Sequence, residues 1–265
     1  MMLTLAYTMH QGKICRQQQD GILIDGAIYQ APVLPVTASS LAADEVLLAV
    51  ADGVASSGGN RQIAPQQASR IVLEELAKEV LEHPEWLQDG FVANRHLRRV
   101  QERLADRLAG HPETYGAAST LVVAHIRGQR AAILNVGDSR VYQVSREGRW
   151  RRLSKDHTVL QGMINRGEAS PDAEYASIYG MLEHVLCADP EESDFAIHRV
   201  LVTLEPGDRL VLCSDGIHDE IGEAMMWELF DPMLGVAAQV KIWRDAVWRH
   251  GAEDNLSLVV VTVET

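Results

Sequence analysis

Two helix-like segments next to each other in the sequence, with short strand-like segments on either side, most constrain the fold of this chain. Apolar residues recur every fourth position over residues 64–80 and at helical spacing over residues 97–108. The strand-like segments are rich in β-branched residues: Leu3–Met9, Val46–Ala51, Ser119–Ile126, Ala131–Val136, Val141–Val144, Arg209–Cys213 and Leu256–Val263. Shorter helices are expected after Thr158, near Asp219 and near Val236.

Tight turns join successive strand-like segments in the second half of the chain. Arg127-Gly128 and Glu147-Gly148 are typical hairpin turns. Hairpins imply antiparallel pairing, which argues against an alternating parallel α/β fold. Two layers of antiparallel sheet with helices outside would bury the apolar faces of the helices. No linker, repeat or low-complexity tract is visible, so residues 1–265 are expected to form a single domain.

Charge and cysteine content exclude several function classes. The chain has 265 residues, of which 24 are Lys or Arg and 37 are Asp or Glu, giving a net charge of −13. Such a chain would repel nucleic acid and anionic membranes. Three cysteines with no CxxC pair, no long apolar run and no signal-peptide pattern together predict a cytoplasmic location without a membrane span.

Aspartates stand where apolar strands end or begin. Asp52, Asp138, Asp215 and Asp254 each lie beside a Gly or Asn that permits a tight turn. One such pair is an ordinary turn, but four at the ends of apolar strands predict a cluster of carboxylates. Clustered carboxylates repel one another and need cations, and ligation by oxygen alone favours Mg²⁺ or Mn²⁺. No HxH or HExxH pattern suggests zinc.

Six segments, in order, resemble the metal-dependent Ser/Thr protein phosphatases, the PPM or type 2C class. They are AVADG at 49–53, GAASTLVV from 116, NVGDSR at 135–140, LSKDHT at 153–158, PGDRLVLCSDGIHD at 206–219 and EDNLSL at 253–258. The resemblance covers nearly the whole chain and is to the bacterial members made of a catalytic domain alone. It implies an α+β fold: a four-layer α/β/β/α sandwich of two antiparallel β-sheets flanked by helix pairs.

The same resemblance assigns a metal site and catalytic residues. Asp52 would bridge two Mn²⁺ or Mg²⁺ ions, and the Gly53 carbonyl would bind one of them. Asp215 and Asp254 would complete the site, and Asp138 with Asp215 would hold a possible third ion. Asp20 would be an acid behind the metal ligands, or would hold metal-bound waters.

The implied activity is hydrolysis of phosphoserine and phosphothreonine in proteins by a metal-activated water. Such an enzyme would oppose a bacterial Ser/Thr kinase, in some cases in secretion-system control. A flap at about residues 159–194 is expected to influence substrate choice. A cysteine phosphatase is excluded because no cysteine begins a C-x5-R loop, and the P-loop signature is absent.

The first motif departs from the family pattern G-x-x-R-x-x-N-E-D. Gly12 and Asp20 keep their spacing, but Cys15 stands where the family has its phosphate-binding arginine. On an extended strand, Arg16 would point to the opposite face and could recover the role only through a bulge. Lys13 is an alternative, as is weak substrate binding; we expect Arg16 to bind the phosphate.

Other positions also differ from the family or have two interpretations. Gln19 replaces the acidic residue of the first motif, and Val54 stands where many eukaryotic members have a general-acid histidine. His157 is expected to be structural. The arginines of residues 95–107 are expected to form a solvated helix face, and Trp243 and Trp248 to pack on the last helix.

Two other functions stay open from the sequence. The altered first motif is compatible with a catalytically weak or silent relative that binds a partner or phosphopeptide, although the intact aspartates argue against it. A metal-dependent phosphatase of small phosphoesters is the second alternative. Binding of Mn²⁺ and a comparison of phosphopeptide with small-metabolite substrates would separate these hypotheses.

Overall fold

The structure is a computed structural model that describes residues 2–54, 64–87, 90–114, 116–171, 173, 175–189 and 194–264. The first half of the chain contains β1 (Met2–His10), β2 (Gly21–Ile24), β3 (Ala27–Tyr29), β4 (Val33–Ala42), β5 (Glu45–Ala51), β6 (Gly53–Val54), α1 (Ala64–Glu82), α2 (Gly90–Leu108), η1 (Pro112–Thr114), β7 (Ala118–Ser119) and β8 (Leu121–Arg127). The second half contains β9 (Arg130–Val136), β10 (Arg140–Val144), β11 (Trp150–Arg152), α3 (Val159–Asn165), η2 (Ser177–Gly180), β12 (Leu186–Cys187), β13 (His198–Thr203), β14 (Arg209–Cys213), α4 (Asp215–Glu228), α5 (Val236–His250) and β15 (Leu256–Val263).

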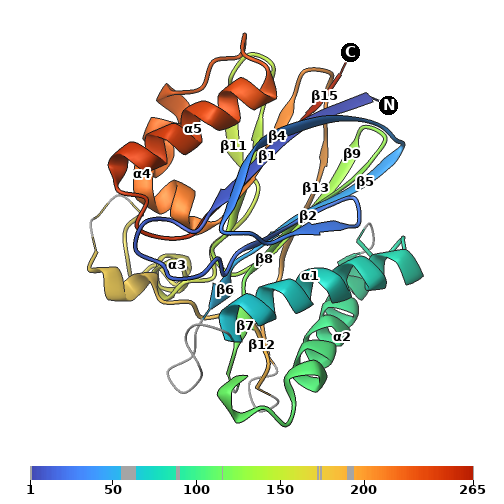
Figure 1. Cartoon of the computed structure of the whole chain (residues 1–265), viewed down its shortest axis with the longest axis vertical. Helices are drawn as coiled ribbons and strands as arrows, with labels where there is room; N and C mark the ends of the chain where they lie inside the picture. The colour runs from blue at the N-terminus through green and yellow to red at the C-terminus, as the bar shows by residue number, and fades with distance from the viewer. Residues whose placement is uncertain are drawn as a thin grey trace.

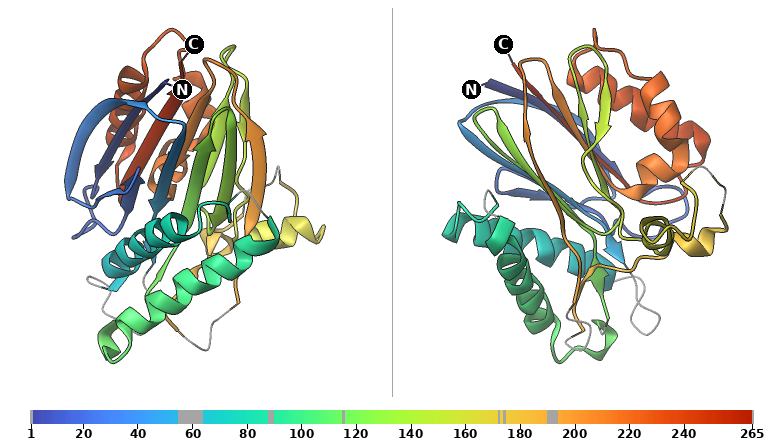
Figure 2. Two further views of the ribbon diagram at one scale, coloured as in Figure 1. Left: turned by 90° about the vertical axis from the view of Figure 1, so that its right-hand side faces the viewer. Right: turned by 180° about the vertical axis from the view of Figure 1, so that it is seen from behind.

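Two six-stranded antiparallel sheets form the centre of the molecule. One has the strand order β11-β10-β14-β15-β1-β4 and the other β13-β9-β8-β5-β2-β3. A three-stranded sheet, β12-β7-β6, lies below the second in the view of Figure 1. Helices α1 and α2 lie on one side of the sheets, and α4 and α5 on the other (Figures 1 and 2). The predicted α+β sandwich of helix, sheet, sheet and helix layers is confirmed.

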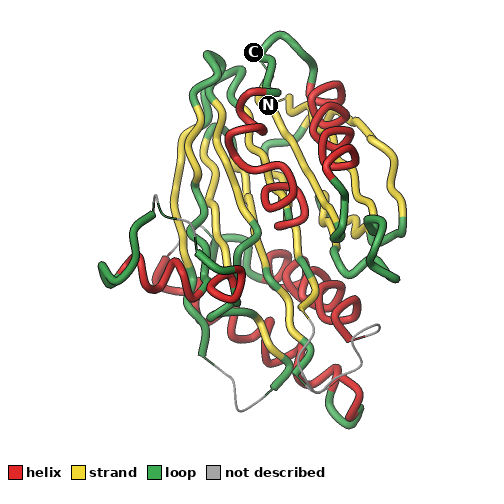
Figure 3. The backbone as a smooth tube through the Cα atoms, turned by 90° about the vertical axis from the view of Figure 1, so that its left-hand side faces the viewer, coloured by secondary structure: helices red, strands yellow, loops and turns green. Residues whose placement is uncertain are grey.

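Three buried apolar clusters hold these layers together. The central cluster lies between the sheets and includes Leu5, Leu48 and Leu212. A second cluster packs α1 and α2 on the β5 sheet, and a third packs α4 and α5 on the β14 sheet. Figure 3 shows α4 and α5 against the strands that they cover. Each six-stranded sheet is covered on both faces. The sequences of its strands therefore include continuous apolar runs as well as alternating apolar and polar residues.

Most predicted elements are present, and one predicted strand is wrong. Residues 256–263 form β15 as predicted, and both predicted hairpins are observed. Ser119–Ile126, however, is two strands in two sheets, β7 and β8, with a break at Thr120. The Thr120 backbone N–H donates to the Asp52 carbonyl (2.8 Å), and its hydroxyl accepts from the Asp52 N–H (3.1 Å). These bonds redirect the chain from one sheet to the next.

Seven strands lie outside the segments predicted as strands: β2, β3, β4, β6, β11, β12 and β13. Strands β3 and β4 lie at sheet edges, and β4 alternates between exposed and half-buried residues. Strand β2 has only four residues, and β13 pairs along β9 at the other edge of the same sheet. An edge strand buries few side chains, so its apolar pattern is weak.

The arginine-rich face of α2 is not simply solvated. Arg99 and Arg103 pair with Glu79 of α1 at 3.2 and 3.0 Å, and Arg107 pairs with Glu74 and Glu75 at 2.6 and 3.1 Å. Glu79 is fully buried, so these guanidinium groups compensate its charge. The arginines therefore join the two helices. No described helix is long and apolar enough to cross a bilayer.

The two tryptophans of α5 should differ in their contribution to stability. Trp243 is fully buried and its indole donates to the Met226 carbonyl, whereas 42% of Trp248 is exposed. Trp243→Ala is expected to lower the free energy of unfolding by about 3–5 kcal/mol, and Trp248→Ala by less than about 1 kcal/mol. Urea denaturation of both variants tests this, and equal losses would contradict the packing described here.

Candidate metal centre

Aspartates from four separate parts of the chain meet at one edge of the sandwich. Asp52 follows β5, Asp138 lies between β9 and β10, Asp215 follows β14, and Asp254 precedes β15. Burial, then the charges of Asp215, Asp20, Asp138 and Asp254, raise the pKa of Asp52 well above its usual range. The clustering predicted from the strand ends is therefore observed.

Other carboxyl groups of the cluster also have raised pKa values. Burial and the charges of Asp138, Asp254 and Asp20 raise the pKa of Asp215 well above its usual range. Burial is also the main reason why the pKa of Asp138 rises to about 7 and that of Asp20 to about 6. Without a cation, some of these carboxyl groups would bind protons near neutral pH.

Two glycines allow the segments that carry the aspartates to approach closely. A Cβ on Gly216 would lie 1.9 Å from the Asn255 carbonyl oxygen, and one on Gly12 would lie 2.2 Å from the Asp254 carbonyl oxygen. Gly12 also has a positive φ of 74°. These contacts pack the loop after β1 and the start of α4 directly against the turn that carries Asp254.

Asp20 is the most deeply buried carboxylate of the site. Its side chain has no exposed surface, and its Oδ2 accepts from the Ser214 hydroxyl at 2.8 Å. That hydroxyl in turn accepts from the Ser257 backbone N–H at 3.0 Å. The other oxygen of Asp20 and one oxygen of Asp138 are buried with no hydrogen-bond partner among the described residues. Unpaired buried carboxylate oxygens suit cations or water held by cations.

Hydroxyl groups connect the backbone of two further aspartates. Thr120, which hydrogen-bonds the backbone of Asp52, also pairs its hydroxyl with that of Ser139 at 2.8 Å. Ser139 adjoins Asp138, and both hydroxyl-bearing residues are fully buried. Gly53 is buried too: a Cβ there would meet the Pro65 carbonyl oxygen at 2.2 Å.

Asn255 fixes the loop of the first motif, a role that sequence reasoning missed. Its Oδ1 accepts from the Gln19 N–H at 2.5 Å, and its Nδ2 donates to the carbonyls of Gln11 (2.8 Å) and Gln17 (3.1 Å). Asn255 is buried, and the three glutamines are half-buried. The sequence signal was an amide directly after a site aspartate and before an apolar strand.

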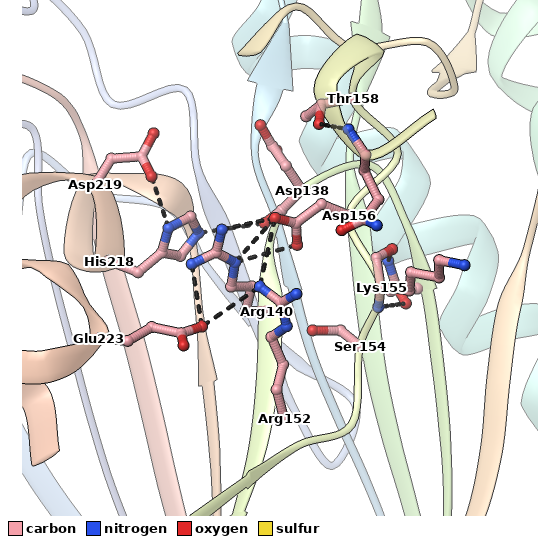
Figure 4. A network of polar contacts seen from close by, with 12 residues as sticks. Asp138, Arg140, Arg152, Ser154, Lys155, Asp156, Thr158, His218, Asp219 and Glu223 are labelled. Atoms are coloured by element: carbon pink, nitrogen blue, oxygen red, sulfur yellow. Dashed lines mark hydrogen bonds and ion pairs between the residues drawn. The ribbon is translucent and has the colours of Figure 1, made fainter. Parts of the chain in front are cut away.

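A second missed group holds Asp138 in place (Figure 4). Arg140 donates to both carboxylate oxygens of Asp156, the shortest contact being 2.6 Å, and it also pairs with Glu223 at 3.3 Å. His218 lies between the Asp219 carboxylate (2.8 Å) and the Asp138 carbonyl (3.2 Å). These ion pairs tie the β9–β10 connection to α4 and to the segment after β11.

The segment around Cys15 is a loop and not a strand, so the predicted strand register does not apply. The Cys15 thiol lies 3.2 Å from Asp254 Oδ1, and burial together with the Asp254 charge raises its pKa to about 12. A neutral S–H group therefore donates to Asp254 where the family pattern has a cation.

The two basic neighbours of Cys15 differ in position. Lys13 donates its ammonium to the Trp248 carbonyl (2.8 Å) and lies over the Trp248 ring, so it is held on α5. The alternative in which Lys13 binds phosphate stays a prediction, and in this structure the ammonium contacts Trp248 instead. Arg16 is exposed, and the structure gives its guanidinium no hydrogen bond or ion pair within the described residues.

One other group of possible metal ligands lies outside this edge. It consists of Glu79, His83 and His96, whose possible ligand atoms all lie within 4.8 Å of one another. Among the described residues, no other three acidic, His or Cys side chains are so close, and the edge aspartates are more widely spaced. Arg99 and Arg103 already neutralise Glu79, which makes this group part of the α1–α2 ion-pair network. The unpaired carboxylates therefore lie at the sheet edge.

Comparison with known proteins settles the family. The sequence model described as protein phosphatase 2C matches residues 36–250. The chain belongs to this family. The family resemblance predicted from the six sequence segments is thereby confirmed.

Several relatives within the family are bacterial phosphatases. The serine/threonine phosphatase stp of Listeria innocua is 27% identical over 223 residues, which cover 81% of this chain and 83% of the relative. The serine/threonine protein phosphatase PstP of Mycobacterium tuberculosis is 27% identical over 220 residues, which cover 82% of this chain and 40% of the relative. The chain thus spans less than half the length of that second relative.

Solved structures of other proteins share the fold. The catalytic domain of PstP in complex with two manganese ions has a TM-score of 0.74 and 22% identity, with 100% of both chains covered. PppA, a regulatory component of T6SS in Pseudomonas aeruginosa, has a TM-score of 0.72 and 21% identity, with 98% of this chain and 97% of that chain covered. The 2C-family fold is therefore shared over almost the whole chain.

His157 should make this edge sensitive to acid. Its Nδ1 accepts from the Gly137 N–H at 3.1 Å, and burial lowers its pKa to about 4. The folded state thus favours the neutral ring, so its contribution to stability is complete above about pH 6.5 and is lost as the pH falls through 4.

We expect His157→Asn, whose amide oxygen can accept from the same N–H, to make the loss of stability between pH 6.5 and 4 shallower than in the parent chain. Urea denaturation at a series of pH values measures this. Parallel pH profiles for the two proteins would contradict the role given to His157.

Proposed function

We propose that this chain is a metal-dependent protein phosphatase that hydrolyses phosphoserine and phosphothreonine in proteins. Two Mn²⁺ or Mg²⁺ ions would be held by the carboxylates of Asp52, Asp215 and Asp254 and by the Gly53 carbonyl. Asp138 and Asp215 would hold a third ion, and Asp20 would bind through water. The observation that carries this proposal is the convergence of these aspartates in a 2C-family fold.

The donor set fits hard divalent cations. It consists of oxygen atoms alone, and the buried Asp20 and Asp138 each keep one oxygen without a partner among the described residues. When bound, the ions supply an activated water nucleophile and neutralise the phosphoryl oxygens. Burial and the charges of neighbouring aspartates already raise the pKa values of Asp52 and Asp215, so cation binding should release protons at neutral pH.

The surrounding residues of this chain orient the aspartates. Thr120 hydrogen-bonds both the carbonyl and the N–H group of Asp52, and the Ser214 hydroxyl orients the Asp20 carboxylate. Asn255 anchors the first-motif loop beside Asp254, and the Cys15 thiol contacts the Asp254 carboxylate. Held in this way, the carboxylates need little rearrangement when cations and substrate bind.

Loss of a central aspartate should abolish hydrolysis. Asp52→Asn and Asp215→Asn keep the side-chain size and remove one negative charge each, and each is expected to lower Mn²⁺-dependent kcat/KM on a phosphothreonine peptide by more than about 10³-fold. EDTA should abolish the activity of the parent chain.

Titration calorimetry with Mn²⁺ is the companion measurement. Glu228→Gln, which removes an exposed charge from the same helix, is the control. Retained activity in Asp52→Asn would contradict the metal assignment. A folded parent chain that binds Mn²⁺ but turns over no phosphopeptide would support the silent, partner-binding alternative.

Arg16 is our candidate for binding the substrate phosphate. It is the exposed arginine of the first-motif loop, next to Cys15, whose thiol contacts Asp254. Arg16→Ala is expected to raise KM for a phosphopeptide roughly tenfold, as for a lost charge-assisted hydrogen bond.

Lys13→Ala is the matched control, because the Lys13 ammonium is held at Trp248. This variant should leave KM unchanged. A rise in KM for Lys13→Ala and none for Arg16→Ala would reverse the assignment.

The flap at about residues 159–194 is proposed to influence substrate choice within a single phosphatase domain. Its base is closed by backbone bonds from Val159 to Met181 (2.9 Å) and from Glu183 to His157 (2.8 Å). Ile178 and Met181 expose 61% and 57% of their surface there. Such apolar side chains could contact residues that flank the phosphorylated one.

The proposed partners are a phosphorylated protein and a Ser/Thr kinase acting in opposition. The fold shared with PppA, a regulatory component of T6SS, supports secretion-system control as one setting. Deleting the gene and comparing phosphoproteomes would identify substrates as the sites whose phosphorylation rises.

A further inference from the structure

Strand β11 forms an exposed, basic edge beside the proposed active site. It is the last strand of its sheet and pairs with β10 alone among the described strands. Residues 144–155, which contain it, include five Lys or Arg residues and a single Glu, in a chain of net charge −13. Figure 2 (right) shows the β10–β11 hairpin in yellow-green beside the orange helices α4 and α5. Positive charge is therefore concentrated on one edge of an acidic chain.

Half of the backbone groups of β11 face away from the sheet. The Arg149 carbonyl accepts across the β10–β11 pair at 2.9 Å, and the Leu153 N–H donates across it at 2.8 Å. In an antiparallel pair, residues that bond to the partner strand alternate with residues whose N–H and C=O groups point outward. Trp150 and Arg152 are out of phase with these bonds, so their backbone groups point toward the open edge. Unpaired groups of this kind can take up an added strand.

The arginines near the hairpin turn keep charge available for a partner. Arg151 is exposed and donates to the neutral side chain of Gln143 at 2.8 Å. Arg149 pairs with Glu147 at 3.1 Å, but both side chains are largely exposed, and an exposed pair of this kind contributes little to stability. Arg149 can therefore exchange Glu147 for the carboxylate of a partner at little cost.

Other carboxylates near β11 are already engaged by the protein. Glu223 lies 3.4 Å from Arg152, and Asp156 lies 3.7 Å from it (Figure 4). Both carboxylates also bind Arg140. Asp208 is buried and already accepts a side-chain N–H group at 2.8 Å. Arg152 therefore belongs to the network of Figure 4, and the charge that a partner can use lies further along the strand.

An exposed aromatic side chain adjoins the basic edge. Trp227 of α4 exposes 47% of its surface, and its ring centre lies 6.3 Å from that of Trp150 in β11. Glu228, its neighbour in the sequence, is exposed to solvent. Tryptophan beside arginine is the composition that protein interfaces favour. Nucleic acid also binds basic surfaces, but the net charge of this chain repels it. The edge is thus suited to a protein segment that carries carboxylates.

We propose that the edge of β11 docks an extended, acidic segment of the phosphoprotein substrate. The backbone of this segment adds a strand to the sheet, and its carboxylates pair with Arg149 and Arg151. This inference rests on the proposed phosphatase function and names the class of substrate: phosphoproteins with an acidic stretch near the phosphorylated residue.

The direction of β11 determines which side of the phosphorylated residue docks. The strand runs toward the aspartate edge, where Arg152 meets Asp156. An antiparallel added strand, the more stable kind, leads away from that edge. Arg152 pairs in register with Tyr142, four residues after Asp138, so roughly 13 Å of extended chain separate the two positions. The acidic stretch should therefore begin about four residues C-terminal to the phosphorylated residue.

Binding of unphosphorylated peptides tests the docking separately from catalysis. Two labelled peptides of equal length are used, one with alternating Glu and Thr and one with Gln in place of Glu, and their fluorescence anisotropy is measured with the full chain in EDTA. We expect the Glu peptide to bind roughly tenfold more tightly than the Gln peptide. Arg149→Gln combined with Arg151→Gln should remove this difference. Arg95→Gln, which removes an exposed charge from α2, is the matched control and should keep it.

Hydrogen exchange identifies the strand that receives the peptide. Bound Glu peptide should slow exchange of the backbone N–H groups of Trp150 and Arg152 roughly tenfold, because each would donate to the added strand. Equal affinity for the two peptides, an equal loss of affinity in Arg95→Gln and in the double variant, or unprotected amides at Trp150 and Arg152 would each overturn the proposal.

Steady-state kinetics with Mn²⁺ test the direction of docking. A phosphothreonine peptide with the acidic stretch on its C-terminal side should have a KM about tenfold lower than one with the stretch on its N-terminal side, at equal kcat. The double variant should raise KM for the first peptide alone. Equal KM values for the two peptides would overturn the proposed direction. A chain that hydrolyses neither peptide contradicts the proposed phosphatase function, and binding in EDTA then decides the docking by itself.

Discussion

Repulsion between buried carboxylates is the constraint on which the rest of this structure depends. Asp52, Asp138 and Asp215 lie at the ends of strands that the apolar cores bring together, and burial raises the pKa of each. The charges of other aspartates of the site raise the pKa values of Asp52 and Asp215 further. Folding must therefore offset an unfavourable electrostatic arrangement. The three apolar clusters, one between the sheets and one under each helix pair, provide the stabilisation that holds these charges together.

Close backbone approaches and hydrogen bonds from neutral groups make the arrangement specific. Gly216 and Gly12 let the start of α4 and the first-motif loop contact the turn at Asp254–Asn255. Thr120, Ser214 and Asn255 then fix the backbone or carboxylates of that edge without adding charge. The result is a preorganised set of oxygen ligands, in keeping with a family whose member PstP has been solved with two manganese ions.

Strand β14 has residues of opposite charge at its two ends. Its first residue is the buried Arg209, and Asp215 follows two residues after its last. The positive end therefore lies at the α5 N-terminus and the negative end at the aspartate edge.

The sequence by itself determined the class of fold and the identity of the central residues. The informative patterns are local: apolar runs ending in Asp-Gly or Gly-Asp, hairpin turns and two amphipathic helices. Each is present in the structure because burial and turn geometry act over a few residues. Tertiary structure alone decided the rest. Four features depend on contacts between residues distant in sequence. They are the break at Thr120, the placement of Lys13 on Trp248, the contact of Cys15 with Asp254 and the α1–α2 ion pairs. Such contacts leave no periodic signal, because they are set by which surfaces the packed layers bring within hydrogen-bonding distance.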